Sequence, residues 1–155
     1  NCFVGKWVDD LNSISGTEEK IMDNLDKQID AFLKAPAFAV VGASDDKSKY
    51  GHKVYKCCLD HGLKAYPVNP NAETVMGNPA YASLSELPEK VEAISIITPP
   101  KITEKVVDEA IKAGVKHIWM QPGAESLQAV EHATKSGVSC VYGGACLLIV
   151  LGYRE

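Results

Sequence analysis

From residue 37 onward, short apolar runs alternate with longer segments in which apolar residues recur every three or four positions. Runs such as AFAVV at 37–41 and AISIIT at 93–98 are apolar almost throughout, which is typical of strands buried on both faces of a parallel sheet. The three- and four-residue spacing predicts amphipathic helices between the strands. The expected strands are 37–41, 64–68, 93–98, 116–120 and 139–142, and the expected helices are 51–61, 101–113 and 125–136.

A glycine follows each of these three helices and leads into the next strand. Gly62, Gly114 and Gly137 stand where helices commonly end in the left-handed conformation, which glycine adopts without a steric penalty. Regular alternation of strand and helix predicts an α/β fold with a doubly wound, mainly parallel sheet.

The segment 69–92 interrupts this alternation with a series of Asn and Pro turn signals. It leaves room for a short third strand at 80–82 and for one turn of helix at 85–87. With right-handed crossovers, the strands numbered in chain order form a sheet of order 3-2-1-4-5, with room for a sixth strand. Open sheets of this kind bind ligands where the winding reverses, here at the carboxyl ends of strands 1 and 4.

An additional helix is expected before the sheet. Ser15 and Glu18 have the spacing of a capping box, and a wide apolar stripe follows before Pro36. The stripe predicts a helix over 17–34 that packs on the body of the domain, with apolar positions at Ile21, Leu25, Ile29, Phe32 and Leu33. We therefore expect an N-terminal arm, 1–16, and a single domain, 17–155.

The chain of 155 residues is long enough for one domain with a full core, and its formal net charge is -4. An acidic balance argues against nucleic acid or a membrane surface as a partner, because both favour a basic protein face. The first ten residues are too acidic for a targeting peptide, so we expect a cytoplasmic protein. The five cysteines have neither the even count of a disulfide framework nor the spacing of metal ligands, and no metal is expected.

The sequence VVGASDDKSKYGHKV at 40–54 joins the first strand to the helix at 51–61. Gly42 allows a sharp turn, Ser44 adds a hydroxyl group, and Gly51 permits close approach at the helix start. The backbone amides of such a turn and the positive end of the helix dipole favour a phosphate group. Nearby cations are Lys47, Lys49 and Lys53.

This turn differs from the usual NAD-binding turn in two ways. The G-x-G-x-x-G pattern is absent, and Asn69 stands where an acidic residue would bind the adenosine ribose. Both differences lower the expectation of NAD without excluding it. A Gly-Ala-Ser corner also occurs in plain strand-to-helix turns, so its position at the crevice is what favours a ligand.

Four blocks of sequence resemble a known family. VVGAS…YGHKV, YPVNPN, SLSELPEKVEAISIITPP and HIWMQPGAES are similar to the compact bacterial, archaeal and fungal CoA-binding domain proteins. That family is related to the CoA-binding part of the succinyl-CoA synthetase α subunit. The resemblance covers roughly 37–150, and it implies a Rossmann-like fold with CoA or an acyl-CoA as ligand.

The resemblance also implies a role for the loops after the first two strands. The CoA pyrophosphate would be held by Gly42, Ala43, Ser44, Lys47, Tyr50 and Gly51. The adenosine would be bordered by Val68, Asn69 and Pro70. Its 3′-phosphate would be within reach of Lys47 or Lys49.

Two further loops would complete the site. The opposite wall, against the adenine or the pantetheine, would be formed by Thr98, Pro99 and Pro100. The pantetheine arm would meet the end of the strand at 116–120, with Met120, Gln121, Pro122 and Gly123. The last segment departs from the family pattern, because Ala145 precedes Cys146 where relatives often have Pro-Cys.

The leading hypothesis is a protein that binds CoA or an acyl-CoA without catalysis of its own. No acid–base pair and no nucleophile–base arrangement accompanies these positions, and His52 is expected to face solvent on its helix. Two alternatives stay open: an NAD(P)-binding redox module and an α-type fragment of an acyl-CoA ligase. The sequence is also compatible with a homodimer.

Overall fold

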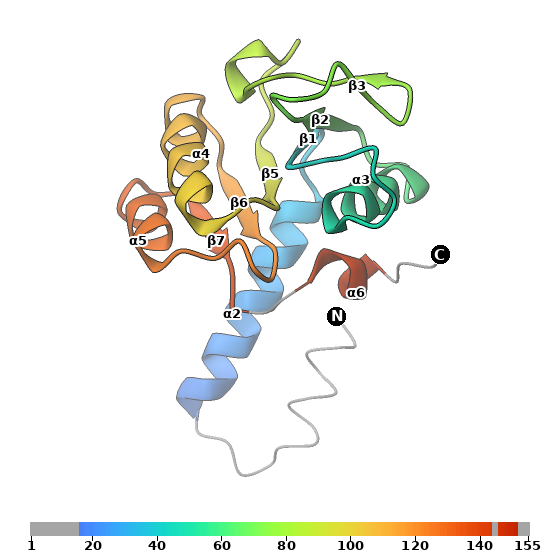
Figure 1. Ribbon diagram of the computed structural model, residues 1–155. Helices are drawn as coiled ribbons and strands as arrows, with labels where there is room; N and C mark the ends of the chain where they lie inside the picture. The colour runs from blue at the N-terminus through green and yellow to red at the C-terminus, as the bar shows by residue number, and fades with distance from the viewer. Residues whose placement is uncertain (1–15, 144–145, 152–155) are drawn as a thin grey trace.

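The computed structural model describes residues 16–143 and 146–151. Within these ranges, five parallel strands form one sheet in the order β2-β1-β5-β6-β7 (Figure 1). The N-terminal arm expected at 1–16 lies outside the described residues, except for Gly16, which begins a helix. The strands of the sheet are β1 (Phe38–Val41), β2 (Ala65–Val68), β5 (Ala93–Ile96), β6 (His117–Met120) and β7 (Ser139–Val141).

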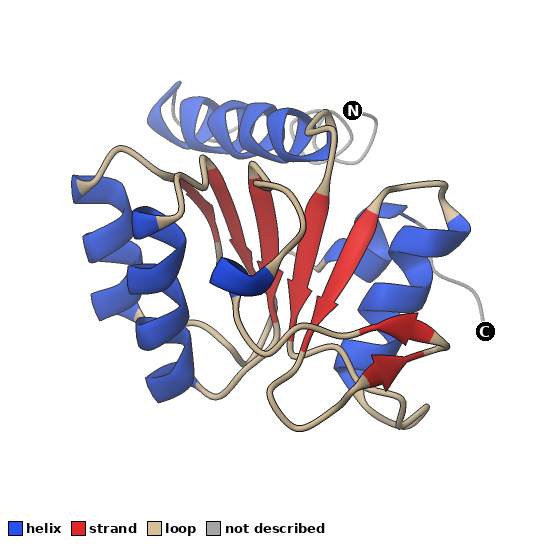
Figure 2. Ribbon diagram, turned by 90° about the horizontal axis from the view of Figure 1, so that it is seen from above, coloured by secondary structure: helices blue, strands red, loops and turns tan. Residues whose placement is uncertain are grey.

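The connections between these strands lie on both faces of the sheet (Figure 2). The helix α3 (Tyr50–Asp60) joins β1 to β2 and packs on one face. The helices α4 (Pro100–Lys112) and α5 (Leu127–Lys135) join β5 to β6 and β6 to β7, and they pack on the other. The winding therefore reverses between β1 and β5, which confirms the predicted α/β fold, Rossmann-like and doubly wound, and its switch point.

The third strand differs from the prediction. Within the described residues, the expected strand at 80–82 is a single parallel bridge between Tyr81 and Val68 at the edge of β2. The chain before it forms a separate antiparallel hairpin from β3 (Thr74–Val75) and β4 (Asn78–Pro79). Because the hairpin uses the residues that would lengthen a third strand, the sheet has the order 2-1-4-5-6 in the numbering used above. A 3₁₀ turn, η1 (Leu84–Glu86), follows the bridge.

The face that carries α3 is completed by two other helices. The helix α3 covers β1 and β2. The later crossover helices, α4 and α5, lie on the opposite face, so another part of the chain must cover β6 and β7 on the face that carries α3. The helix α2 (Gly16–Leu33) packs against β6 and β7, one residue out of step with the predicted 17–34. The short helix α6 (Leu147–Leu151), which the sequence pattern did not predict, packs beside α3.

Aromatic rings pack together where α2 meets the sheet. Phe32 is 1% exposed, and its ring lies edge-on to that of Trp119 at 5.3 Å between centroids. The Phe38 ring lies at the same distance from Phe32 on the other side. Full burial of an aromatic side chain is worth about 2–3 kcal/mol, so α2 is an integral layer of the domain. No helix among the described residues has the length and apolar character needed to cross a bilayer.

Candidate functional site

Two glycines bring the turn after β1 against its neighbours. Gly42 has a φ of +100°, and a Cβ atom there would lie 2.1 Å from the carbonyl oxygen of Ile97. A Cβ atom at Gly51 would lie 1.9 Å from the carbonyl oxygen of Gly42. No other residue type fits either position without movement of the backbone. The amino terminus of α3 therefore lies directly on the turn, at the carboxyl end of β1.

Hydrogen bonds from three directions hold the turn in place. The Asn69 side-chain amide donates to the Ala43 carbonyl at 2.9 Å, and His52 Nδ1 donates to the Ser44 carbonyl at 2.9 Å. From the β3–β4 hairpin, the backbone amide of Met76 donates to the Asp45 carboxylate at 2.6 Å. These bonds tie the turn to β2, to α3 and to the hairpin.

The bonds also decide which backbone groups remain available to a ligand. The amide of Gly42 donates to the carbonyl of Val68 at 2.9 Å, so it continues the sheet instead of pointing into the crevice. Within the described part of the chain, the amides of Ala43 and Ser44 have no hydrogen-bond acceptor. The expectation that His52 faces solvent is wrong, because His52 is 6% exposed and fixes the turn from inside.

A cleft of about 500 Å³ opens beside this turn, between the loops that follow β1 and β2 and the face of α4 that runs from Ile102 to Glu109. Seven predicted site residues line it: Gly42, Lys49, Val68, Asn69, Pro70, Thr98 and Pro99. Residues that the sequence analysis missed form much of the remaining wall: Asn71, Ala82, Ser83, Leu84, Ile102, Lys105, Val106 and Glu109.

The missed residues on α4 had a recognisable signal. Ile102, Val106 and Glu109 are separated by four and three positions, which places them on one helical face. The helix begins at the switch point, directly after Thr98-Pro99, so this face borders the crevice. Extending the site from the loop to the first helical turns that follow it would have found these residues.

A second hollow of about 330 Å³ lies on the other side of the same loop. Thr98 and Pro99 line both hollows, and the second one is completed by Ile97, Pro122, Gly123 and Ala124. The Thr98 and Thr103 hydroxyl groups are hydrogen-bonded at 2.8 Å, which fixes the start of α4 at this junction. The two hollows therefore lie at the carboxyl edge of the sheet and share one wall.

The predicted residues Met120 and Gln121 lie inside the protein, and Tyr50 is partly exposed. Met120 and Gln121 are 0% exposed. The Gln121 side chain donates to Ser95 Oγ at 3.0 Å and accepts hydrogen bonds from the Leu147 amide at 2.9 Å and the Tyr50 hydroxyl at 3.3 Å. Gln121 therefore joins β5, α6 and the start of α3.

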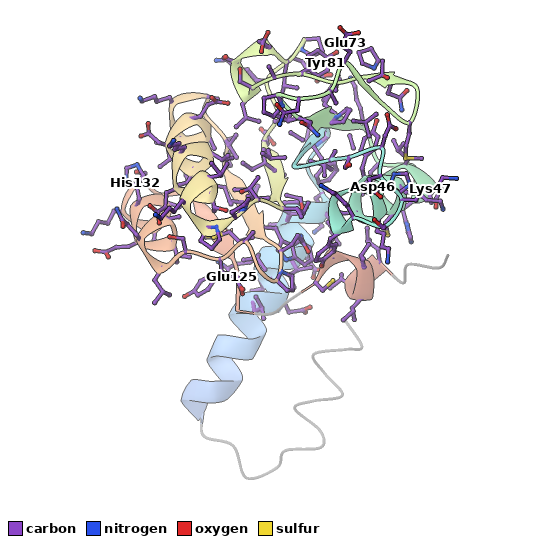
Figure 3. The ribbon with its side chains drawn as sticks, viewed as in Figure 1. Asp46, Lys47, Glu73, Tyr81, Glu125 and His132 are labelled. Atoms are coloured by element: carbon purple, nitrogen blue, oxygen red, sulfur yellow. The ribbon has the colours of Figure 1, made fainter. Side chains whose placement is uncertain are left out.

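The remaining predicted residues lie around the turn without lining the cleft. Ala43 and Gly51 are buried, Ser44 is partly exposed, and Lys47 and Pro100 are exposed. Lys47 lies next to Asp46 on the loop before α3 (Figure 3). Hydrogen bonds from Ser48 lower the pKa of the Asp46 carboxyl group, so this loop tip carries a negative charge as well as a positive one.

A doubly wound sheet with a glycine-tight turn and a cleft at its switch point is the architecture of a Rossmann-like α/β domain. Residues 36–152 match the family model described as CoA binding domain. The chain belongs to this family, which confirms the resemblance found in the sequence.

Several relatives are CoA ligases. The chain is 37% identical over 91 residues to the α subunit of acetate–CoA ligase [ADP-forming] II of Pyrococcus furiosus, an alignment that covers 58% of this chain and 20% of the relative. It is 32% identical over 119 residues to acetate–CoA ligase [ADP-forming] I of Archaeoglobus fulgidus, with 70% and 17% covered. The chain thus spans about a fifth of the length of these relatives.

Solved structures of similar size also match. A conserved hypothetical protein from Pyrococcus furiosus is 39% identical with a TM-score of 0.70, and the match covers 74% of this chain and 97% of that one. A hypothetical protein from Pyrococcus horikoshii OT3 is 31% identical with a TM-score of 0.76, with 81% and 87% covered.

Proposed function

We propose that this protein binds CoA or an acyl-CoA in the cleft at the carboxyl ends of β1 and β5, without catalysing a reaction of its own. The observation that carries the proposal is the coincidence of the glycine-tight turn and the cleft at the switch point of a CoA-binding domain. Ligands of open α/β sheets bind at this position.

The ligand would lie with its pyrophosphate at the turn. The amides of Ala43 and Ser44 and the amino terminus of the eleven-residue helix α3 supply hydrogen-bond donors and a positive potential for it. The adenosine would occupy the cleft of about 500 Å³, between Pro70 and Ile102. The pantetheine arm would cross Thr98-Pro99 toward the hollow near Gly123.

The chemistry around the cleft favours binding over catalysis. Its ionisable lining residues are Lys49, Lys105 and Glu109, and Glu109 accepts a hydrogen bond from the backbone amide of Leu84. Burial raises the pKa of the Cys58 and Cys140 thiols to about 12, so both remain protonated and unreactive at neutral pH. None of these groups forms a nucleophile–base pair.

Isothermal titration calorimetry with CoA, 3′-dephospho-CoA and NAD tests the proposal. CoA is expected to bind most tightly, with saturation at one ligand per chain. Equal affinity for all three compounds, or no binding of any of them, would contradict it. Native mass spectrometry of the freshly purified protein adds an independent test, because a retained ligand reports its own mass.

A ligase role is the second candidate, and the named relatives favour it. They are ADP-forming CoA ligases or their α subunits, and this chain spans about a fifth of their length. In such an assembly the present domain would hold CoA for a reaction carried out with other domains. CoA-dependent ADP formation from ATP and acetate by a co-purified complex, and its absence with this chain alone, would support this role.

The NAD-binding alternative has less support. An NAD site needs an acceptor for the ribose hydroxyls at the end of β2, whereas the Asn69 side chain donates to Ala43 and accepts from the amide of Asn71 at 2.8 Å. We also propose a cytoplasmic location, which suits the free thiols of Cys57, Cys58, Cys140 and Cys146. Homodimer formation stays a proposal that light scattering of the purified protein would test.

A further inference from the structure

Two lysines line the cleft from different elements. Lys49 belongs to the loop after β1, and Lys105 belongs to α4, which follows β5. Apolar side chains, among them those of Ile102 and Val106, line the same cleft. Lys105 thus adds a positive charge at a place that is separate from the turn with the free amides of Ala43 and Ser44.

The acidic residues near Lys105 on α4 are engaged elsewhere. Glu104 accepts a hydrogen bond from Ser126 at 2.8 Å, and Glu109 accepts one from the Leu84 amide. Asp108 pairs with Lys112 at 3.1 Å and lies 3.5 Å from His132. Each carboxylate within one helical turn of Lys105 therefore has another partner.

Several lysines elsewhere in the described part of the protein are neutralised by ion pairs. Lys56 pairs with Asp60, Lys116 pairs with Glu92, and Lys135 pairs with Glu131. Among the residues that the structure describes, neither Lys49 nor Lys105 forms such an ion pair. Two unpaired ammonium groups on one cleft favour an anionic ligand there.

We propose that Lys105, together with Lys49, binds the 3′-phosphate of CoA and makes the site select CoA over ligands that lack this group. This inference rests on the proposed function, because it assumes that the adenosine occupies the cleft. With the pyrophosphate at the turn and the adenosine in the cleft, the 3′-phosphate would lie in the space that Lys49 and Lys105 line. Lys47, which the sequence offered as an equal candidate, does not line the cleft.

The test compares CoA with 3′-dephospho-CoA, two ligands that differ only in the proposed contact. The variants are Lys105→Gln and Lys49→Gln, with Lys101→Gln as the matched control, because Lys101 lies one turn earlier on α4 and does not line the cleft. A charge-assisted hydrogen bond to phosphate predicts that Lys105→Gln weakens CoA binding about 10-fold or more. Its affinity for 3′-dephospho-CoA should change less than about 2-fold, because that ligand lacks the phosphate.

Added salt supplies a second readout. The preference of the unmodified protein for CoA over 3′-dephospho-CoA should fall as NaCl rises from about 0.05 to 0.5 M, since exposed charges are screened. Lys105→Arg should keep the preference. Circular dichroism of each variant checks that the fold is retained.

The outcomes separate this inference from the proposed function. If CoA binds but Lys105→Gln weakens both ligands equally, or Lys101→Gln has the same effect as Lys105→Gln, the inference is wrong and the proposed function stands. If neither ligand binds to the unmodified protein, the proposed function itself is wrong. A selective loss of CoA affinity in Lys105→Gln, absent from Lys101→Gln, supports both.

Discussion

The backbone of Gly51 packs directly against that of Gly42, with 1.9 Å between a Cβ atom built at Gly51 and the carbonyl oxygen of Gly42. Gly51→Ala should therefore push the start of α3 away from the turn. Overpacking of this kind costs about 1–3 kcal/mol of folding free energy. The displaced helix start should also weaken CoA binding, because the turn and the helix would no longer point their amides at one phosphate. Urea unfolding and calorimetric titration measure the two effects.

Gly62→Ala is the control for this prediction. Gly62 has a φ of +73°, and a Cβ atom there would meet nothing within 4 Å. Its substitution carries about 1 kcal/mol of left-handed backbone strain but leaves the turn untouched. We expect a smaller loss of stability and normal CoA binding. Equal effects of the two substitutions on binding would count against the packed helix start as part of the site.

Gln121→Leu tests whether the Gln121 side chain stabilises the fold or contacts the ligand. Leucine removes the side-chain amide that serves Ser95, Leu147 and Tyr50, and a buried polar group left without a partner costs about 1–3 kcal/mol. We therefore expect a clear fall in the thermal unfolding midpoint. If the variant keeps its stability and loses only CoA affinity, the Gln121 side chain contacts the ligand as the family resemblance implies.

Gln121 also illustrates how much of the structure the sequence could predict. Apolar runs located every strand of the parallel sheet to within a residue or two at each end, because strands buried on both faces consist mainly of apolar residues. The same pattern cannot give the direction of a side chain just beyond a strand. Gln121 follows β6 directly, and the turn there directs its amide toward Ser95 instead of the crevice.

The wrong prediction of a third strand and the failure to predict the cleft residues on α4 have a different cause. The turn signals left room for a strand at 80–82, but the residues before it form the hairpin at 74–79. That hairpin is held by residues far away in the sequence, because Asp45 accepts from the Met76 amide and Tyr55 accepts from the Asn78 side chain. Periodicity predicted a helix at 101–113 and its apolar face, but a periodic pattern does not indicate which part of the protein that face contacts. Only the folded chain brings Ile102 and Lys105 opposite the loop after β1.

Among the residues that the structure describes, Met76 is the one non-glycine residue with a positive φ. It has a φ of 51°, and Gly77, which follows it in the hairpin turn, has a φ of 79°. Two consecutive positive φ values define a turn that prefers Asn-Gly. Met76→Asn should therefore stabilise the protein by about 0.5–1 kcal/mol, whereas Met76→Ala should give no gain. Chemical denaturation of both variants measures the difference, and a destabilised Met76→Asn would contradict the prediction.

The buried thiol of Cys140 should make the stability of the protein fall at alkaline pH. Burial raises its pKa to about 12, whereas the thiol of the unfolded chain ionises near 8.5–9. The folded state keeps this proton while the unfolded state loses it, so the stabilising contribution is complete below about pH 8.5 and is lost as the pH rises toward 12. Between pH 8 and 10 the unmodified protein should lose about 1.5–2 kcal/mol more stability than Cys140→Ala. Urea unfolding at both pH values gives this difference, and identical slopes for the two proteins would refute it.

Ile102 provides a test of the cleft itself. The side chain is 43% exposed on α4 and lines the cleft, so a polar replacement costs little stability. Ile102→Glu would introduce a carboxylate beside Lys105 and remove the apolar surface proposed to contact the adenosine. We expect CoA binding to weaken by about 1.5–3 kcal/mol, from lost apolar contact and from repulsion of the phosphates. Leu127→Glu is the matched control, because Leu127 is 80% exposed and lies outside the cleft. Unchanged CoA affinity in Ile102→Glu, with the fold intact, would contradict the proposal that the ligand contacts α4.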